Sequence, residues 1–296
     1  MIRFLVFSDL HYDHIFDADN RIKFLISKLD DANFNFIISL GDLCYPTHSN
    51  KRVINQFRSL KIPFYHCNGN HDCEEYNLKD IKNFWNTNSL HYSFTIDRTK
   101  FIILNSCFME HDGKELLYKK DLYIKQTDTY PIISRTEVEW LRQEMYDENL
   151  KYVIFSHHSF VNDYVKRGIC NKEEIRKILE KRHTLLAMNG HDHGSDLRIL
   201  NRIPYYTVNS ASYLWHGMKP MYTYEEDIHN RYPFIKDIIL YKSPLYCVVE
   251  IDDAKVKIIG VKSEYQNIRP EEIGIVDRLW NGVSVEPHTL SWENEI

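Results

Sequence analysis

The stretch MNGHDHGSD, residues 188–196, sets two histidines two positions apart, with an aspartate between them and glycines on both sides. Taken alone it suits a surface turn, because Gly, Asn, Asp and Ser are common turn residues. It also gathers side chains that can bind a metal at a place where glycine lets the backbone bend. The rest of the chain decides between these two interpretations.

Short apolar runs recur along the 296 residues, and polar residues follow each of them closely. Runs of this length are typical of buried strands, and they occupy residues 2–7, 34–40, 62–67, 100–105, 151–155 and 184–188. Amphipathic patterns between several of them predict helices at residues 17–32, 134–145 and 171–182. Strands that alternate with helices predict an α/β fold.

The organisation of the chain changes after about residue 204. We expect one domain over residues 1–296, with a core that carries the motifs at 1–212. Residues 213–244 are rich in Tyr, Trp, His and Met without clear periodicity, which indicates a lid or insertion. Residues 245–262 predict a β-hairpin, and residues 263–296 form a C-terminal extension.

Five of the apolar runs lead directly into side chains with carboxylate, amide or imidazole groups. These residues are Asp9 and His11; Asp42; Asn70, His71 and Asp72; His157 and His158; and His191 and His193. Residues two apart in an extended chain point the same way, as expected for Asp9 with His11 and for His191 with His193. Because the carboxyl ends of strands in α/β folds share one rim, this mixture predicts a metal site there.

The ordered blocks D-L-H, G-D, G-N-H-D, H and G-H-D-H resemble those of the calcineurin-like metallophosphoesterase family over residues 1–212. The resemblance implies a four-layer α/β/β/α sandwich with two metal ions at the strand ends. Mn or Fe is expected first and Zn second. Glycines 190 and 194 would let the backbone pass close to the metals. The implied ligands are Asp9, His11 and His193 for one ion and Asn70, His157 and His191 for the other, with Asp42 bridging and His158 a weaker alternative to His157.

The same resemblance implies hydrolysis of a phosphate ester, either a monoester or a diester, by in-line attack of a metal-bridging hydroxide. His71 would act as the general acid, and Asp72 would orient it and raise its pKa. The expected substrate is a small molecule, nucleotides included. Residues 107–133 and 213–244 carry lysines and aromatic residues and are expected to select it. The block G-N-H-D, in place of G-N-H-E, disfavours the serine/threonine protein phosphatases of the superfamily.

Two alternatives stay open, a nuclease of the same superfamily and a binding scaffold without catalysis, as in retromer-type relatives. A formal net charge of −5 disfavours nucleic acid as a partner.

No apolar run approaches the roughly 18 residues of a membrane span. The six cysteines are scattered without C-x-x-C spacing, so we expect a reduced, cytoplasmic protein. The sequence leaves the oligomeric state open.

Overall fold

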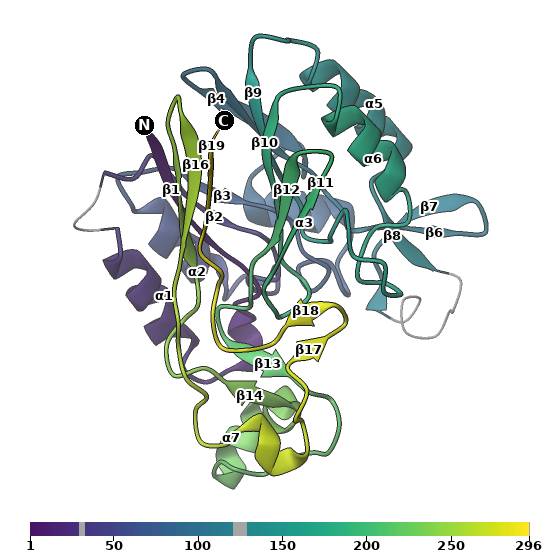
Figure 1. Ribbon diagram of the computed structural model, residues 1–296. Helices are drawn as coiled ribbons and strands as arrows, with labels where there is room; N and C mark the ends of the chain where they lie inside the picture. The colour runs from purple at the N-terminus through teal and green to yellow at the C-terminus, as the bar shows by residue number, and fades with distance from the viewer. Residues whose placement is uncertain (30–32, 121–128, 296) are drawn as a thin grey trace.

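Two six-stranded sheets lie face to face in the computed structural model, which describes residues 1–29, 33–120 and 129–295 (Figure 1). The first sheet has the order β19 (Trp292–Glu295), β16 (Lys255–Gly260), β15 (Cys247–Ile251), β1 (Ile2–Phe7), β2 (Phe36–Ser39) and β3 (Phe64–His66). Strands β1, β2 and β3 run parallel, whereas β15, β16 and β19 extend the sheet with antiparallel pairs.

The second sheet has the order β11 (Asp196–Leu200), β12 (Ile203–Thr207), β10 (Thr184–Asn189), β9 (Lys151–Phe155), β5 (Thr99–Ile103) and β4 (Tyr92–Ile96). Its four central strands are parallel, and β4 and β11 pair antiparallel at the edges. All six predicted strands are present, within one or two residues of their predicted ends.

The side chains of β1 show how the layers form. Successive strand residues point to opposite faces, and both faces of β1 are apolar. Phe4 and Val6 join the core between the two sheets, whereas Leu5 and Phe7 join the core on the outer face. A strand that is buried on both faces is a continuous apolar run in sequence, which explains the pattern at residues 2–7.

Helices cover both outer faces. On the first sheet they are α1 (Ala18–Ser27), α2 (Lys51–Arg58) and α3 (Leu78–Trp85), and on the second sheet α5 (Arg135–Glu144) and α6 (Lys172–Leu179). Helix α5 begins after Ser134, whose side chain accepts from the N–H of Glu137. Apolar layers between helices and sheets, and between the sheets, confirm the predicted α/β/β/α sandwich.

Residues 213–244 form a lobe beyond the sheets, at the bottom of Figure 1. It contains β13 (Tyr213–Trp215), α7 (Glu226–Arg231), a 3-10 helix at Pro233–Asp237 and β14 (Ile238–Leu240), and β13 pairs with β14. That this lobe acts as a lid stays a prediction. Two further 3-10 helices lie at Tyr12–His14 and Pro270–Ile273.

The remaining strands form small sheets. One has the order β7 (Lys114–Leu117), β6 (Phe108–His111) and β8 (Tyr130–Ile132), and the other pairs β17 (Leu279–Trp280) with β18 (Val283–Ser284). The C-terminal extension also completes the first sheet, because β19 pairs with β16 and Trp292 packs against the core between the sheets.

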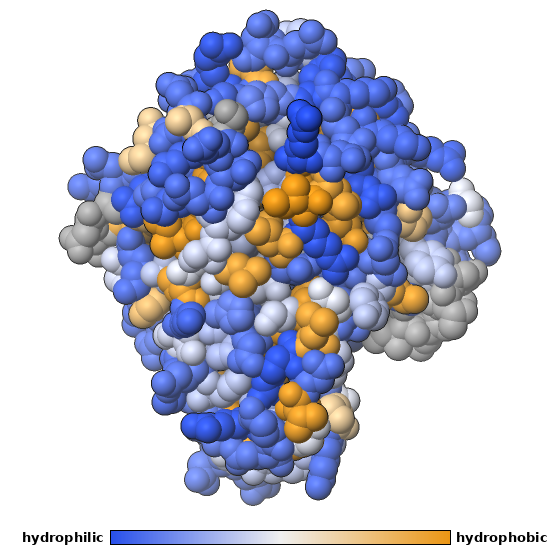
Figure 2. All heavy atoms as spheres, viewed as in Figure 1, coloured by the Kyte–Doolittle hydropathy of each residue, from blue (hydrophilic) through white to orange (hydrophobic). Residues whose placement is uncertain are grey.

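Most of the face in Figure 2 is hydrophilic, and its apolar residues form separate groups. Among the described residues, no helix is both long and apolar enough to cross a membrane.

Candidate active site

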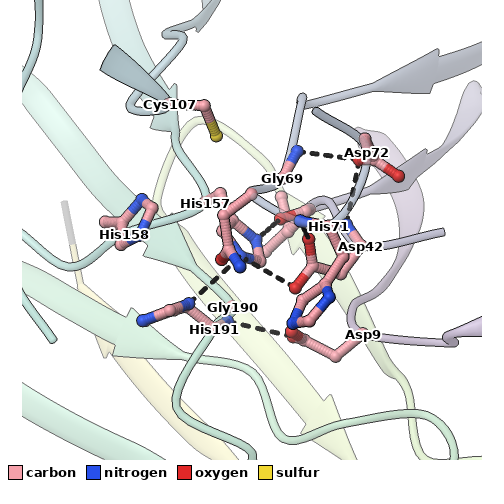
Figure 3. A network of polar contacts seen from close by, with 12 residues as sticks. Asp9, Asp42, Gly69, His71, Asp72, Cys107, His157, His158, Gly190 and His191 are labelled. Atoms are coloured by element: carbon pink, nitrogen blue, oxygen red, sulfur yellow. Dashed lines mark hydrogen bonds and ion pairs between the residues drawn. The ribbon is translucent and has the colours of Figure 1, made fainter. Parts of the chain in front are cut away.

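The loops that follow β1, β2, β3, β9 and β10 meet at one rim, and there the structure brings together all seven of the predicted metal ligands. Figure 3 shows four of them, Asp9, Asp42, His157 and His191. Candidate ligand atoms of Asp9, His11 and His193 lie within 4.8 Å of one another, and those of Asp42, His157 and His191 form a second such group. The amide oxygen of Asn70 lies 3.0 Å from Nε2 of His157 and so joins the second group.

Asp42 lies between the two groups. Its Oδ2 atom is 3.7 Å from Nε2 of His11 and 3.2 Å from Nε2 of His157. Both contacts are buried, with 2% or less of each side chain exposed. A carboxylate in this position can share its charge between two cations.

Five of these residues have a left-handed backbone, with φ of 51° at Asp9, 49° at His11, 52° at Asp42, 70° at His191 and 48° at His193. The prediction that Asp9 with His11, and His191 with His193, are placed by an extended chain is therefore wrong. Left-handed geometry costs a non-glycine residue about 1–2 kcal/mol. It persists where the surrounding structure determines it, which is common at functional sites.

Hydrogen bonds around the loops stabilise this backbone. Asp9 donates its N–H to the carbonyl of Gly41 (3.0 Å), and its carboxylate accepts the N–H of His191 (3.0 Å). The Asp72 carboxylate accepts the N–H of Asp42 (3.0 Å) and of Gly69 (2.7 Å).

Gly190 allows a close approach, as predicted, although the left-handed turns belong to the histidines beside it. A Cβ atom at this position would lie 1.8 Å from Oγ of Ser8 and 2.7 Å from Oδ2 of Asp9. No side chain fits there, so glycine is required for space.

Three of the histidines direct one ring nitrogen to a backbone carbonyl. Nδ1 of His157 lies 2.8 Å from the oxygen of Leu40, Nδ1 of His193 lies 3.1 Å from that of Tyr213, and Nε2 of His191 lies 3.3 Å from that of Lys166. A carbonyl oxygen only accepts, so these ring nitrogens carry the protons. When the ring is neutral, the other nitrogen presents a lone pair to the site, which is the usual arrangement of metal-binding histidines.

The carboxylates near these histidine rings favour the binding of cations. Burial lowers the pKa of His157, but the carboxylates of Asp42 and Asp9 outweigh it and raise this pKa to about 10. The two carboxylates therefore favour a positive charge at His157, from a proton or from a metal ion. Burial raises the pKa of Asp9 to about 7, and its Oδ1 atom has no hydrogen-bond partner among the described residues. Mixed carboxylate, amide and imidazole donors of this kind suit divalent transition metals.

His71 lies beside both groups, and its partner is not the predicted one. Oε1 of Glu74 is 2.6 Å from Nδ1 of His71. Asp72 accepts the backbone N–H of Leu43 and Cys44 as well as those of Asp42 and Gly69, and it lies 3.0 Å from Nε2 of His66. The prediction that Asp72 orients His71 is therefore corrected: Asp72 holds the loops, and Glu74 contacts His71. Burial lowers the pKa of His71, but Asp42 and Glu74 outweigh it and raise this pKa above 6.5.

A model of the calcineurin-like phosphoesterase family matches residues 2–195. The chain belongs to this family. It is accordingly a hydrolase of phosphoric esters that depends on metal.

Solved structures share the fold of this phosphoesterase at low identity. A dimetal phosphatase from Danio rerio is 11% identical, with a TM-score of 0.62 over 90% of this chain and 97% of the other. A purple acid phosphatase from yellow lupin (Lupinus luteus) seeds is 15% identical, with a TM-score of 0.53, and 90% of this chain covers 51% of it. GAP50, the anchor in the inner membrane complex of Plasmodium, is 13% identical, with a TM-score of 0.52 over 90% and 87% of the two chains. Comparison with curated proteins finds no match.

His158 lies outside the two ligand groups of the phosphoesterase. Its Nδ1 atom is 2.9 Å from Oγ of Ser106, and its ring centroid lies 4.2 Å from that of His191. Its position supports the choice of His157 as the candidate ligand.

Glu74 and His14 also lie at the site and were not predicted from the sequence. Nδ1 of His14 lies 3.2 Å from the hydroxyl of Tyr213, and Nε2 lies 2.9 Å from that of Tyr45. The ring stacks on His11 at 4.9 Å. His14 follows His11 by three positions, and this spacing is the signal that could have identified it.

A row of aromatic side chains from distant segments extends from His14. The ring of Phe234 lies 4.4 Å from His14, and Trp215, of which 37% is exposed, lies 5.8 Å from Phe234. The Lys120 ammonium is 5.1 Å from the Phe234 ring centroid. These residues come from both segments that were predicted to select the substrate. Residues 121–128 of the first segment lie outside the described residues.

Proposed function

We propose that this phosphoesterase hydrolyses phosphate esters of small molecules with two divalent cations, Mn or Fe in first place and Zn in second. Asp9, His11 and His193 would hold one ion, and Asn70, His157 and His191 the other, with Asp42 shared. One observation carries the proposal: imidazole lone pairs and carboxylates face one another in two buried groups on either side of Asp42.

When bound, the cations would polarise the phosphoryl oxygens and lower the pKa of a water molecule. The carboxylate of Asp42 would offset part of their charge, and Asn70 would add a neutral oxygen. His71 would protonate the leaving oxygen as a general acid; its side chain is 29% exposed, and its ring centroid lies 4.9 Å from that of His11. We propose in-line attack of water opposite the leaving group, without a covalent enzyme intermediate.

The surroundings of the site favour a small substrate with a planar group. Phe234 and Trp215 offer aromatic faces on which a nucleobase can stack. Nucleotides are therefore the first substrate class to test, among both monoesters and diesters.

The test combines metal analysis with hydrolysis. Purified protein loaded separately with Mn, Fe or Zn is assayed on p-nitrophenyl phosphate, bis-p-nitrophenyl phosphate, nucleotides, cyclic nucleotides and single-stranded DNA. We expect about two ions per chain and turnover of the small esters. Asp42→Asn should abolish both, whereas Asp253→Asn, at an exposed position, should change neither. Two bound ions without turnover of any ester would favour the scaffold alternative, and cleavage confined to DNA would favour a nuclease.

We also propose a cytoplasmic location, on the basis of cysteine chemistry. All six cysteines are free thiols, and five of them are buried. Free thiols are typical of reducing compartments. Cell fractionation of a tagged chain tests this proposal.

A further inference from the structure

Glu74 is a buried carboxylate that directly contacts the proposed general acid. Its side chain is 5% exposed, and Oε1 lies 2.6 Å from Nδ1 of His71. The two atoms lie at ion-pair distance, although neither has a partner with hydrogen-bond geometry among the described residues. At this distance two lone pairs would repel, which favours a proton on Nδ1. The contact leaves Nε2 as the ring nitrogen that can exchange a proton with a substrate.

The backbone holds Glu74 and His71 in a fixed relation. The carbonyl of Asn70 accepts the N–H of Cys73 (3.1 Å) and of Glu74 (3.2 Å), which closes one turn of chain around His71. The N–H of His71 itself donates to Oδ1 of Asp42 (2.8 Å). One short turn therefore places a candidate metal ligand, the acid and the carboxylate together.

The carboxylate of Glu74 is also fixed from its other side. The ammonium of Lys120 lies 3.4 Å from Oε1 and 3.5 Å from Oε2. Oε1 lies close to His71 and both oxygens lie close to Lys120, so charge attraction favours the position of Glu74 beside His71. Asp72 cannot replace it, because its oxygens already accept from the backbone and face His66.

We propose that Glu74 is a positioning residue that holds the Nδ1–H of the protonated His71 ring, so that the second ring proton, on Nε2, faces the leaving-group oxygen and can pass to it. This inference rests on the proposed function and deepens it. A phosphate ester with a poor leaving group needs protonation of the departing oxygen, and p-nitrophenolate leaves without it. Glu74 should therefore matter for the first kind of ester and not for the second.

The kinetic experiment compares phenyl phosphate, with the poorer leaving group, and p-nitrophenyl phosphate. Glu74→Met removes the acceptor and keeps the volume, Glu74→Gln restores a neutral acceptor, and Glu75→Met changes the exposed neighbour as a control. General acids contribute about 10²–10⁴-fold. We expect Glu74→Met to lower kcat on phenyl phosphate about tenfold or more, and on p-nitrophenyl phosphate less than about twofold, with KM and bound metal unchanged. Glu74→Gln should recover part of the loss.

A double-mutant cycle separates positioning from a general structural role. In the His71→Ala background, Glu74→Met should have no further effect on phenyl phosphate, because a residue that acts through His71 loses its effect with it. Equal losses on both esters, or a loss that multiplies with that of His71→Ala, would overturn the inference.

A second readout does not depend on turnover. In Zn-loaded protein with ¹⁵N-labelled histidine, the His71 signals are those that His71→Ala removes. Long-range ¹H–¹⁵N spectra should show a proton on Nδ1 in the wild type and a shift of the tautomer toward Nε2 in Glu74→Met. A wild-type His71 protonated only at Nε2 would refute the role of Glu74. Wild-type protein that hydrolyses neither ester would instead refute the proposed function, and the spectra would still decide the role of Glu74.

Discussion

His11 and His193 are 182 positions apart in the sequence, yet their Nε2 atoms lie 3.0 Å apart. His193 carries its proton on Nδ1, which faces the carbonyl of Tyr213, so its Nε2 presents a lone pair. Oδ1 of Asp9 lies 3.6 Å from the same nitrogen. Three candidate donor groups thus surround one small space in which a cation could be held.

The first prediction concerns metal content. His193→Ala removes one of the four donors proposed for one ion (Asp9, His11, His193 and the shared Asp42), so bound metal should fall from about two ions per chain to about one, measured by elemental analysis after dialysis. Metal that binds only the folded state stabilises it by about 2.7 kcal/mol at a hundredfold excess over Kd. The rise of Tm on adding Mn should therefore be smaller in this variant. His183→Ala, at an exposed position, is the control; two ions in His193→Ala would contradict the assignment.

Gly190 should tolerate no side chain. The added Cβ of Gly190→Ala would meet Ser8 and Asp9, and the strain should lower stability by about 1–3 kcal/mol and weaken metal binding as Asp9 moves. Gly113→Ala has open space but a φ of +70°, so it should lose only about 1–2 kcal/mol and keep its metal. Denaturant unfolding and metal titration measure both effects. Equal metal affinity in the two variants would show that the position of Asp9 does not depend on the absence of a side chain at Gly190.

The buried carboxylate of Glu137 should make the free energy of unfolding depend on pH. Its carboxylate is fully buried on α5, accepts the N–H of Asn105 at 2.6 Å and lies 3.3 Å from Nδ1 of His91. Burial raises its pKa above 4.5, against the lowering effect of His91. The folded state then holds this proton more tightly than the unfolded state. The resulting stabilisation is complete below a pH of about 4.5 and is lost as pH rises through the folded pKa.

Glu137→Gln removes this titration. Relative to the variant, the wild type should lose free energy of unfolding as the pH rises from about 4 to about 8, as measured by Tm at several pH values. Glu139→Gln, on the exposed side of the same helix, should follow the wild type. Parallel curves for the wild type and Glu137→Gln would mean that Glu137 has the same pKa in both states.

Arg21 should be important for stability. Its side chain is 2% exposed, pairs with Asp17 at 2.9 Å, and donates to the carbonyls of Ala211 and Tyr241. Removing one partner of a buried ion pair costs about 3–5 kcal/mol, so Arg21→Ala should lower the free energy of unfolding by about this amount. Arg52→Ala, at a position with 63% of the side chain exposed, should change it by less than about 1 kcal/mol. If Arg21→Ala lowered the free energy of unfolding as little as Arg52→Ala, Arg21 would not stabilise the fold as expected.

Much of the fold could be predicted because it follows from local patterns. The apolar runs at residues 2–7 and 151–155 became β1 and β9 with the same ends, since strands buried on both faces must be apolar throughout. Helices α2 and α3 were not predicted. The predicted helix at residues 17–32 ends at Ser27 in the structure, and residues 30–32 lie outside the described part of the chain.

The sequence by itself determined the chemical kinds of the site residues and their order, because blocks such as G-N-H-D and G-H-D-H stand at the ends of apolar strands. The tertiary structure alone decided how they meet. It placed Glu74 against His71 on the same short turn of chain. It turned the Asp72 carboxylate toward backbone N–H groups of the neighbouring loops instead. It also imposed the left-handed backbone of Asp9 and His193. Local sequence cannot specify that strain, since only contacts from distant strands stabilise it.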